Sequence, residues 1–165
     1  MITGRCLPFG SSVVYTVDPT DGSYVEAFDC ENIVPHVEVP VPGGMTQLLA
    51  MPKNGRRLMF SSFQAGQVGM LDITNPLAFT EVNVVSLGFG SGPHEIVLSD
   101  DDKRLVVTNY FLNEDDFGKL HFEGDHKLNV LRVSDSGLSI DPKFPPIDFN
   151  TAFGTPMRPH GVQMK

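Results

Sequence analysis

The sequence has few positive charges and no long apolar run, and these absences exclude two classes of partner. Lysine and arginine number 12 against 20 acidic residues, which gives a formal net charge of −8. No basic cluster is present that could neutralise nucleic-acid phosphates, so we expect no nucleic-acid partner. No apolar run is long enough to cross a bilayer, and residues 1–10 lack the apolar stretch of a signal peptide. We expect no membrane span and a cytoplasmic location.

Cysteine is also scarce, and the common sequence motifs of catalysis are missing. Cys6 and Cys30 are the only cysteines, and their separation fits no zinc or redox motif. Without a secretory signal, we expect both thiols to be reduced. No nucleophile motif, P-loop or dinucleotide fingerprint is present. The glycine-rich stretch 88–92 precedes an expected strand, so it cannot present a helix N-terminus to a phosphate.

Turn-forming residues, in contrast, are abundant. The chain of 165 residues contains 16 glycines and 13 prolines, while 41% of its residues are hydrophobic. The hydrophobic content is that of a folded chain long enough to bury a core. The many turn formers favour short strands and tight turns over long helices.

A repeat with an offset of 47 residues organises the middle of the chain. Each copy has a short apolar run, a polar turn rich in Asp, Asn and Gly, and a second apolar or β-branched run. The first copy spans 47–62 with its turn at 53–55, and the second spans 94–109 with its turn at 100–102. This pattern is typical of a β-hairpin, so each copy is expected to begin a repeating unit.

The residues after each hairpin supply further strands. After the first hairpin, we expect a third strand at 67–73 and a fourth at 80–85, where polar and apolar residues alternate. After the second, we expect a third strand at 128–133 and an outer edge at 138–140 and 147–149. Four strands in about 40 to 50 residues are typical of a β-propeller blade.

The predicted fold class is therefore all-β, a partial β-propeller of about two complete four-stranded blades plus two partial blades. The expected organisation is a partial blade and linker at 1–42, a blade at 43–90, a blade at 91–150 with a long acidic insertion at 110–127, and the first strand of a further blade at 151–165. Within the first segment, we expect a hairpin of 12–17 with 23–28 and a Pro- and Val-rich linker at 31–42.

This number of blades cannot close a ring. A propeller removes its sheet edges by closure, and blades that lack neighbours would expose the apolar faces on which other blades stack. We therefore expect the chain to be a fragment of a longer protein, a degenerate copy or half of an assembly, in which self-assembly or a partner chain closes the propeller.

Three stretches of the chain follow an order known from one family. They are 46–63 leading to Leu71–Pro76, then 91–109, and finally Asp148–Phe149 followed by Pro159–Gly161. In this order they resemble the C-terminal part of the selenium-binding protein (methanethiol oxidase) family, over about 43–165. Neither Cys6 nor Cys30 matches the cysteine motif of the family's N-terminal blades.

The resemblance implies a copper-dependent oxidase that converts methanethiol, oxygen and water to formaldehyde, hydrogen sulfide and hydrogen peroxide. It also implies a small thiol or a selenium species as the bound partner. Two alternatives stay open: a non-catalytic propeller scaffold that binds a protein, and a lactonase-like propeller that depends on a divalent ion.

Two histidines occupy equivalent positions at the starts of successive blades. The repeat aligns Gln47 with His94, and the Pro-His pairs align His94 with His160. The first strand of a blade lines the central channel, so the two imidazoles are expected to converge and could bind a transition metal. The resemblance implies copper. Because a tight copper site needs a third donor, it would have to come from Glu95, Gln47 or blades that are absent. Alternatively, each imidazole could simply hydrogen-bond a neighbouring carbonyl.

The insertion holds further potential ligands. They are Asn113, Glu114, Asp115, Asp116, His121, Glu123, Asp125 and His126. Their spacing matches no calcium loop, and we expect a solvated acidic loop that could cover the channel mouth.

Overall fold

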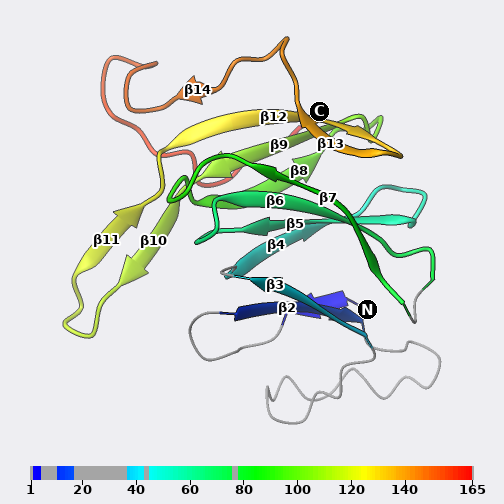
Figure 1. Cartoon of the computed structure of the whole chain (residues 1–165). Helices are drawn as coiled ribbons and strands as arrows, with labels where there is room; N and C mark the ends of the chain where they lie inside the picture. Colours follow the sequence, from blue (N-terminus) through cyan, green and yellow to red (C-terminus); the bar gives the residue numbers. More distant parts are fainter. Residues whose placement is uncertain (1, 5–10, 17–36, 43–44, 76–77, 165) are drawn as a thin grey trace.

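The computed structural model describes residues 2–4, 11–16, 37–42, 45–75 and 78–164. All of its regular structure is β, in antiparallel sheets stacked face to face (Figure 1). The described residues include no helix, and so none that could span a membrane. The fold is a partial β-propeller, as the sequence predicts.

The first complete blade follows the predicted strands closely. It consists of β4 (Thr46–Ala50), β5 (Arg57–Ser62), β6 (Gln67–Asp72) and β7 (Thr80–Ser86), which pair in that order. Its strands are short because each is bounded by a turn that the sequence specifies. At the first turn, Gly55 has a φ of 64°, a conformation that glycine adopts at little cost.

The second blade repeats the first and adds an edge piece. It consists of β8 (Pro93–Leu98), β9 (Arg104–Asn109), β12 (Lys127–Ser134) and β13 (Gly137–Ile140), with the short β14 (Ile147–Asp148) also paired to β12.

The repeat is preserved down to the strand register. Thr46 pairs with Ser62, and 47 residues later Pro93 pairs with Asn109. A β-bulge follows the first pair in both hairpins, ending at Leu49 in one and at Ile96 in the other. The same backbone geometry therefore recurs at the start of each inner strand.

The main core lies between the two blades. Its buried side chains come from both sheets and include Met59, Val68, Met70, Ile96, Leu105, Val107, Leu131 and Leu138. At the outer edge, the side-chain amide of Asn83 on β7 makes two hydrogen bonds to the backbone of Leu138 on β13. It donates to the Leu138 carbonyl at 2.8 Å and accepts from the Leu138 N–H at 2.8 Å. The two blades thus form one packed unit.

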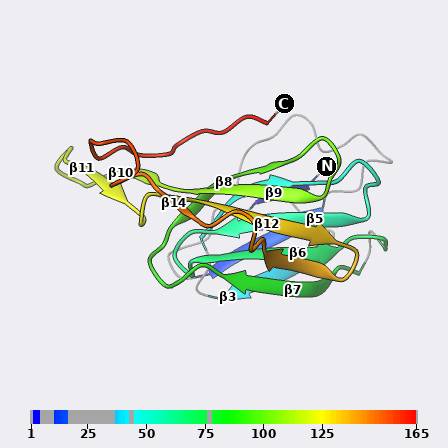
Figure 2. The same cartoon turned by 90° about the horizontal axis from the view of Figure 1, so that it is seen from above.

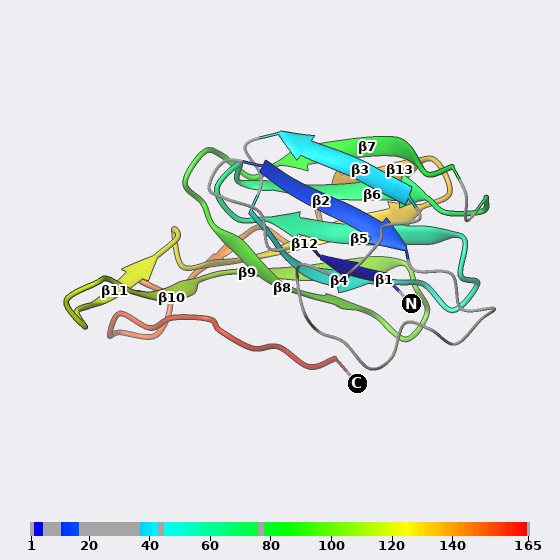
Figure 3. The same cartoon turned by 90° about the horizontal axis from the view of Figure 1, so that it is seen from below.

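The N-terminal sheet differs from the sequence prediction. It consists of β1 (Ile2–Gly4), β2 (Ser11–Thr16) and β3 (Val37–Pro42), and it lies on the far side of the first blade (Figures 1 and 3). The predicted linker at 31–42 is wrong for 37–42, which form β3. Its prolines are tolerated because β3 is at the edge of the sheet, where one row of N–H groups needs no partner strand. The predicted strand at 23–28 lies outside the described residues.

The acidic insertion is not a loop throughout, although its turn at 116–120 is exposed as predicted. It forms a second hairpin of β10 (Phe111–Glu114) and β11 (Leu120–Glu123), which projects away from the blades (Figure 1).

The C-terminal segment was predicted to contain a strand, and this is wrong for the described residues 151–164, which form none. A strand needs a hydrogen-bonded neighbour, and no described strand pairs with this segment. It runs instead along the β8 side of the stack (Figure 2).

Candidate functional site

The candidate site begins at the β-bulge of β8. His94 and Glu95 are the two residues between Pro93 and Ile96, where the register with β9 shifts. Bulges re-aim side chains and are frequent next to functional sites. Gln47 holds the equivalent bulge position on β4, and β4 lies against β8.

Two hydroxyl groups fix the backbones of the histidines in the same way. Ser61 Oγ donates to the His94 carbonyl oxygen at 2.7 Å, and Thr108 Oγ1 donates to the His160 carbonyl oxygen at 3.1 Å. Ser61 and Thr108 are 47 residues apart and occupy the same position on β5 and β9. His160 therefore takes the place that the inner strand of a next blade would take, although its segment is not a strand.

The two imidazoles lie in contact. The ring centroids of His94 and His160 are 5.2 Å apart, with 16° between the ring planes. Tyr110, which directly follows β9, meets the His160 ring edge-on at 5.3 Å. The structure thus brings together the two histidines that the sequence singles out.

Burial lowers the pKa of His94. The largest cause is the loss of solvent around the ring, and the nearby His160 lowers the pKa further, while the Glu95 carboxylate raises it. His94 therefore holds its proton less tightly than an ordinary histidine. The neutral imidazole is the form that binds metal ions.

A third histidine, His126, also contacts Tyr110. The ring centroid of His126 is 5.9 Å from that of Tyr110, and His126 Nδ1 is 3.1 Å from Asn150 Oδ1. His126 has a φ of 57°, a strained conformation for a residue other than glycine. Its buried Nε2 has no hydrogen-bond partner among the described residues.

Sequence reasoning missed Tyr110 and gave His126 no role beyond the acidic insertion. The repeat offers a signal for Tyr110, because an offset of 47 residues aligns it with Phe63, the aromatic residue that directly follows β5. His126 gives no such signal, since its position depends on how the insertion folds back toward Asn150.

As they stand, the two imidazoles are not arranged to bind one metal ion. An imidazole lone pair lies in the plane of its ring, so two stacked rings do not direct their lone pairs at one point. Ligation by both therefore needs one ring to turn, and the side chain of His160 is exposed enough to do so. Among the described residues, no group of three His, Cys, Asp or Glu side chains is placed to hold a metal ion. Glu95 acts electrostatically on His94, and Gln47 lies one blade away.

The Asp115 carboxylate, at the tip of the insertion, makes its contacts within its own hairpin. Asp115 accepts hydrogen bonds from the N–H groups of Phe117 at 3.0 Å and Lys119 at 2.9 Å, and lies 2.8 Å from His121 Nε2. The hydrogen bond with His121 is the largest cause that lowers the pKa of Asp115. These contacts stabilise the turn of the hairpin.

Comparison with solved structures places the fold. The chain is similar to a hypothetical selenium-binding protein from Sulfolobus tokodaii, with 19% identity and a TM-score of 0.59, over 84% of this chain and 35% of that one. It is also similar to a periplasmic gluconolactonase from Pseudomonas aeruginosa, with 16% identity and a TM-score of 0.44, over 84% of this chain and 48% of that one. No protein-family model and no curated protein matches the sequence.

At these identities the likeness is one of fold. The chain spans 35% of the length of the selenium-binding protein. The propeller architecture that the strand pairing shows is thus shared with a longer protein.

Proposed function

We propose that His94 and His160 are two donors of a transition-metal site on the channel side of a propeller similar to the selenium-binding proteins, and that the metal is copper. The observation that carries the proposal is the contact between the two rings, with centroids 5.2 Å apart. The equivalent anchoring of both backbones by Ser61 and Thr108 supports it, because a repeated position on successive blades converges toward the propeller axis.

The protein's own contribution would be to hold the two rings side by side, so that a turn of the exposed His160 ring could bring both to one metal ion. The bulge of β8 aims His94, and burial keeps its proton weakly bound. Tyr110 limits the directions in which the His160 ring can turn. Copper, when bound, would supply a centre for thiolate binding and electron transfer to oxygen. The remaining donors would come from blades beyond the two complete ones.

Metal binding can be tested directly. The background is the Cys6→Ser/Cys30→Ser protein, so that thiols do not compete for copper, and titration calorimetry with Cu(II) gives affinity and stoichiometry. We expect His94→Ala and His160→Ala each to weaken binding by an order of magnitude or more, because each removes one donor. His121→Ala is the matched control, since His121 pairs with Asp115 on the projecting hairpin. Equal affinity in all four proteins would contradict the proposal.

The finer proposal is that the copper-loaded assembly oxidises a small thiol. Methanethiol, oxygen and water would give formaldehyde, hydrogen sulfide and hydrogen peroxide, one of each per turnover. Colorimetric detection of the three products tests this. Copper binding without product formation would remove the oxidase proposal and leave the metal site standing.

A second candidate is a non-catalytic scaffold, and the stacking of the rings favours it. At 16° between planes the two imidazoles pack as flat surfaces, which is how a purely structural pair would be arranged. If the pair is only structural, His160→Phe should leave the free energy of unfolding unchanged. If the pair binds metal, His160→Phe should lose copper binding. The lactonase-like alternative predicts hydrolysis of a lactone that stops when divalent ions are chelated.

We further propose that the exposed face of the second blade is covered by a further blade, from self-assembly or a partner chain. Ile96 and Leu98 on β8 belong to the core between the blades, so Val97 points to the opposite face. Light scattering on purified protein would show a multiple of the monomer mass if a second copy covers this face.

A further inference from the structure

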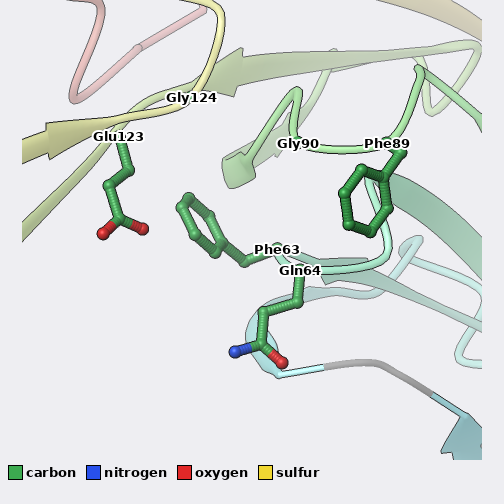
Figure 4. Close-up of a pocket in the computed structure, with 6 residues that line it drawn as sticks. All are labelled: Phe63, Gln64, Phe89, Gly90, Glu123 and Gly124. Carbon is green, nitrogen blue, oxygen red and sulfur yellow. The ribbon is translucent and has the colours of Figure 1, made fainter.

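A cavity lies between two loops of the blades and the base of the projecting hairpin. Its volume is about 400 Å³, and its described lining residues are Phe63, Gln64, Phe89, Gly90, Glu123 and Gly124 (Figure 4). They come from the turn after β5, the loop between β7 and β8, and the base of the projecting hairpin, where β11 ends. Segments distant in sequence thus build one hollow.

Close backbone contacts hold these loops in place. The Leu87 N–H donates to the Gly66 carbonyl at 2.8 Å, and a Cβ on Gly66 would collide with the Gly88 carbonyl. A Cβ on Gly92 would lie 2.9 Å from Gly124 Cα. The Asp125 N–H donates to the Ser91 carbonyl at 2.9 Å. The base of the cavity is therefore fixed by the backbone rather than by mobile side chains.

Phe89 stands at the rim of the cavity with almost no packing. Its side chain is 96% exposed, and it lies between Gly88 and Gly90, which have φ values of 106° and 76°. The ring of Phe63, on the other side of Gln64, is buried. Because Phe89 stabilises nothing in the described structure, a ligand that covers it gains the apolar burial that folding has left unused.

The polar groups of the cavity determine the class of ligand. Glu123 is the one acidic side chain among the described lining residues. Gln64 adds an amide, and the faces of the two phenylalanine rings carry partial negative charge. The chain as a whole has a formal charge of −8, which raises the local concentration of cations.

We propose that this cavity binds a small organic ammonium ion, with its cation near the Glu123 carboxylate and its apolar part across the Phe63 ring toward Phe89 (Figure 4). Aromatic faces combined with a carboxylate are the chemistry that recognises such ions. The proposal goes beyond the metal pair and needs neither His94 nor a bound metal.

The test is an NMR titration of metal-free protein with choline, in the presence of a chelator. We expect saturable shifts of the Gly90 and Gly124 amide resonances. Dimethylbutanol, in which carbon replaces the charged nitrogen, is the neutral comparison, and we expect it to bind about tenfold more weakly or not at all.

Matched variants locate the site. We expect Phe89→Ala and Glu123→Gln each to weaken choline binding by about tenfold. Phe117→Ala is the control, because its residue is 94% exposed at the tip of the projecting hairpin and does not line the cavity. His94→Ala should bind choline normally, which separates this site from the metal pair. The absence of saturable shifts, equally tight binding of dimethylbutanol, or equal losses in Phe89→Ala and Phe117→Ala would overturn the proposal.

Discussion

Ser61 links the two blades at the candidate site, and its replacement by alanine gives a sharp test of that link. Ser61 Oγ accepts the Leu48 N–H at 3.1 Å and donates to the His94 carbonyl oxygen at 2.7 Å. Its side chain is fully buried. Ser61→Ala therefore removes both hydrogen bonds and leaves a backbone N–H of the β4 bulge without this acceptor.

The magnitude follows from these two bonds. Each is worth about 0.5 to 1.5 kcal/mol net, and an unsatisfied buried donor adds to the loss. We expect Ser61→Ala to lower the free energy of unfolding by about 2 kcal/mol, which is about a thirtyfold change in the unfolding equilibrium constant. Urea denaturation followed by circular dichroism measures this difference.

Ser62→Ala is the matched control. Ser62 is the next residue on β5 and is equally buried, but its Oγ has no hydrogen-bond partner among the described residues. Removal of this hydroxyl should change the free energy of unfolding by less than about 0.5 kcal/mol, or stabilise the fold slightly. If the two variants lose equal stability, the loss reflects volume alone, and the proposed role of Ser61 in positioning His94 is refuted.

Three further predictions concern the blades. Leu131→Ala should cost about 2 to 5 kcal/mol in urea denaturation, because Leu131 is fully buried between the blades; a loss below about 1 kcal/mol would mean that this core is not packed as described. Gly69→Ala should cost about 1 to 3 kcal/mol, because the new Cβ would meet the buried Phe60 ring across β5 and β6, and Phe60→Leu in the same protein should restore part of the loss. Asp141→Asn should make the free energy of unfolding depend less steeply on pH under acid conditions. Burial raises the pKa of Asp141, but donors from Lys143, Arg132 and Arg104 outweigh it and hold the pKa below its ordinary value. The stability that ionised Asp141 contributes is therefore present above about pH 4 and is lost as the pH falls through the lowered pKa. If the free energy of unfolding of Asp141→Asn depends on acid pH as steeply as that of the unmodified protein, this prediction is contradicted.

The strands of the two complete blades could be predicted because their signals are local. The turns at 53–55 and 100–102 contain residues that favour tight reversals, and the flanking runs have the composition of strands. The left-handed turn position is even shared, with a φ of 64° at Gly55 and 56° at Asp102. The alignment of His94 with His160 depends on the same repetition, and the structure does bring the two rings into contact.

The remaining features depend on pairing over long distances, which local patterns do not encode. Strand β3 pairs with β2 across more than 20 residues, so its proline-rich sequence resembles a linker when taken alone. The segment around His160 has strand-like residues but no partner strand among those described. The approach of His126 to Tyr110 depends on the fold of the whole insertion.

The central proposal is that His94 and His160 bind one metal ion together. Pulsed electron paramagnetic resonance of the Cu(II)-loaded Cys6→Ser/Cys30→Ser protein counts the imidazoles on the metal through their remote nitrogens. We predict the signal of at least two equatorial histidines, with one fewer in His94→Ala and one fewer in His160→Ala. A signal from a single histidine, or one that neither substitution changes, would contradict the account.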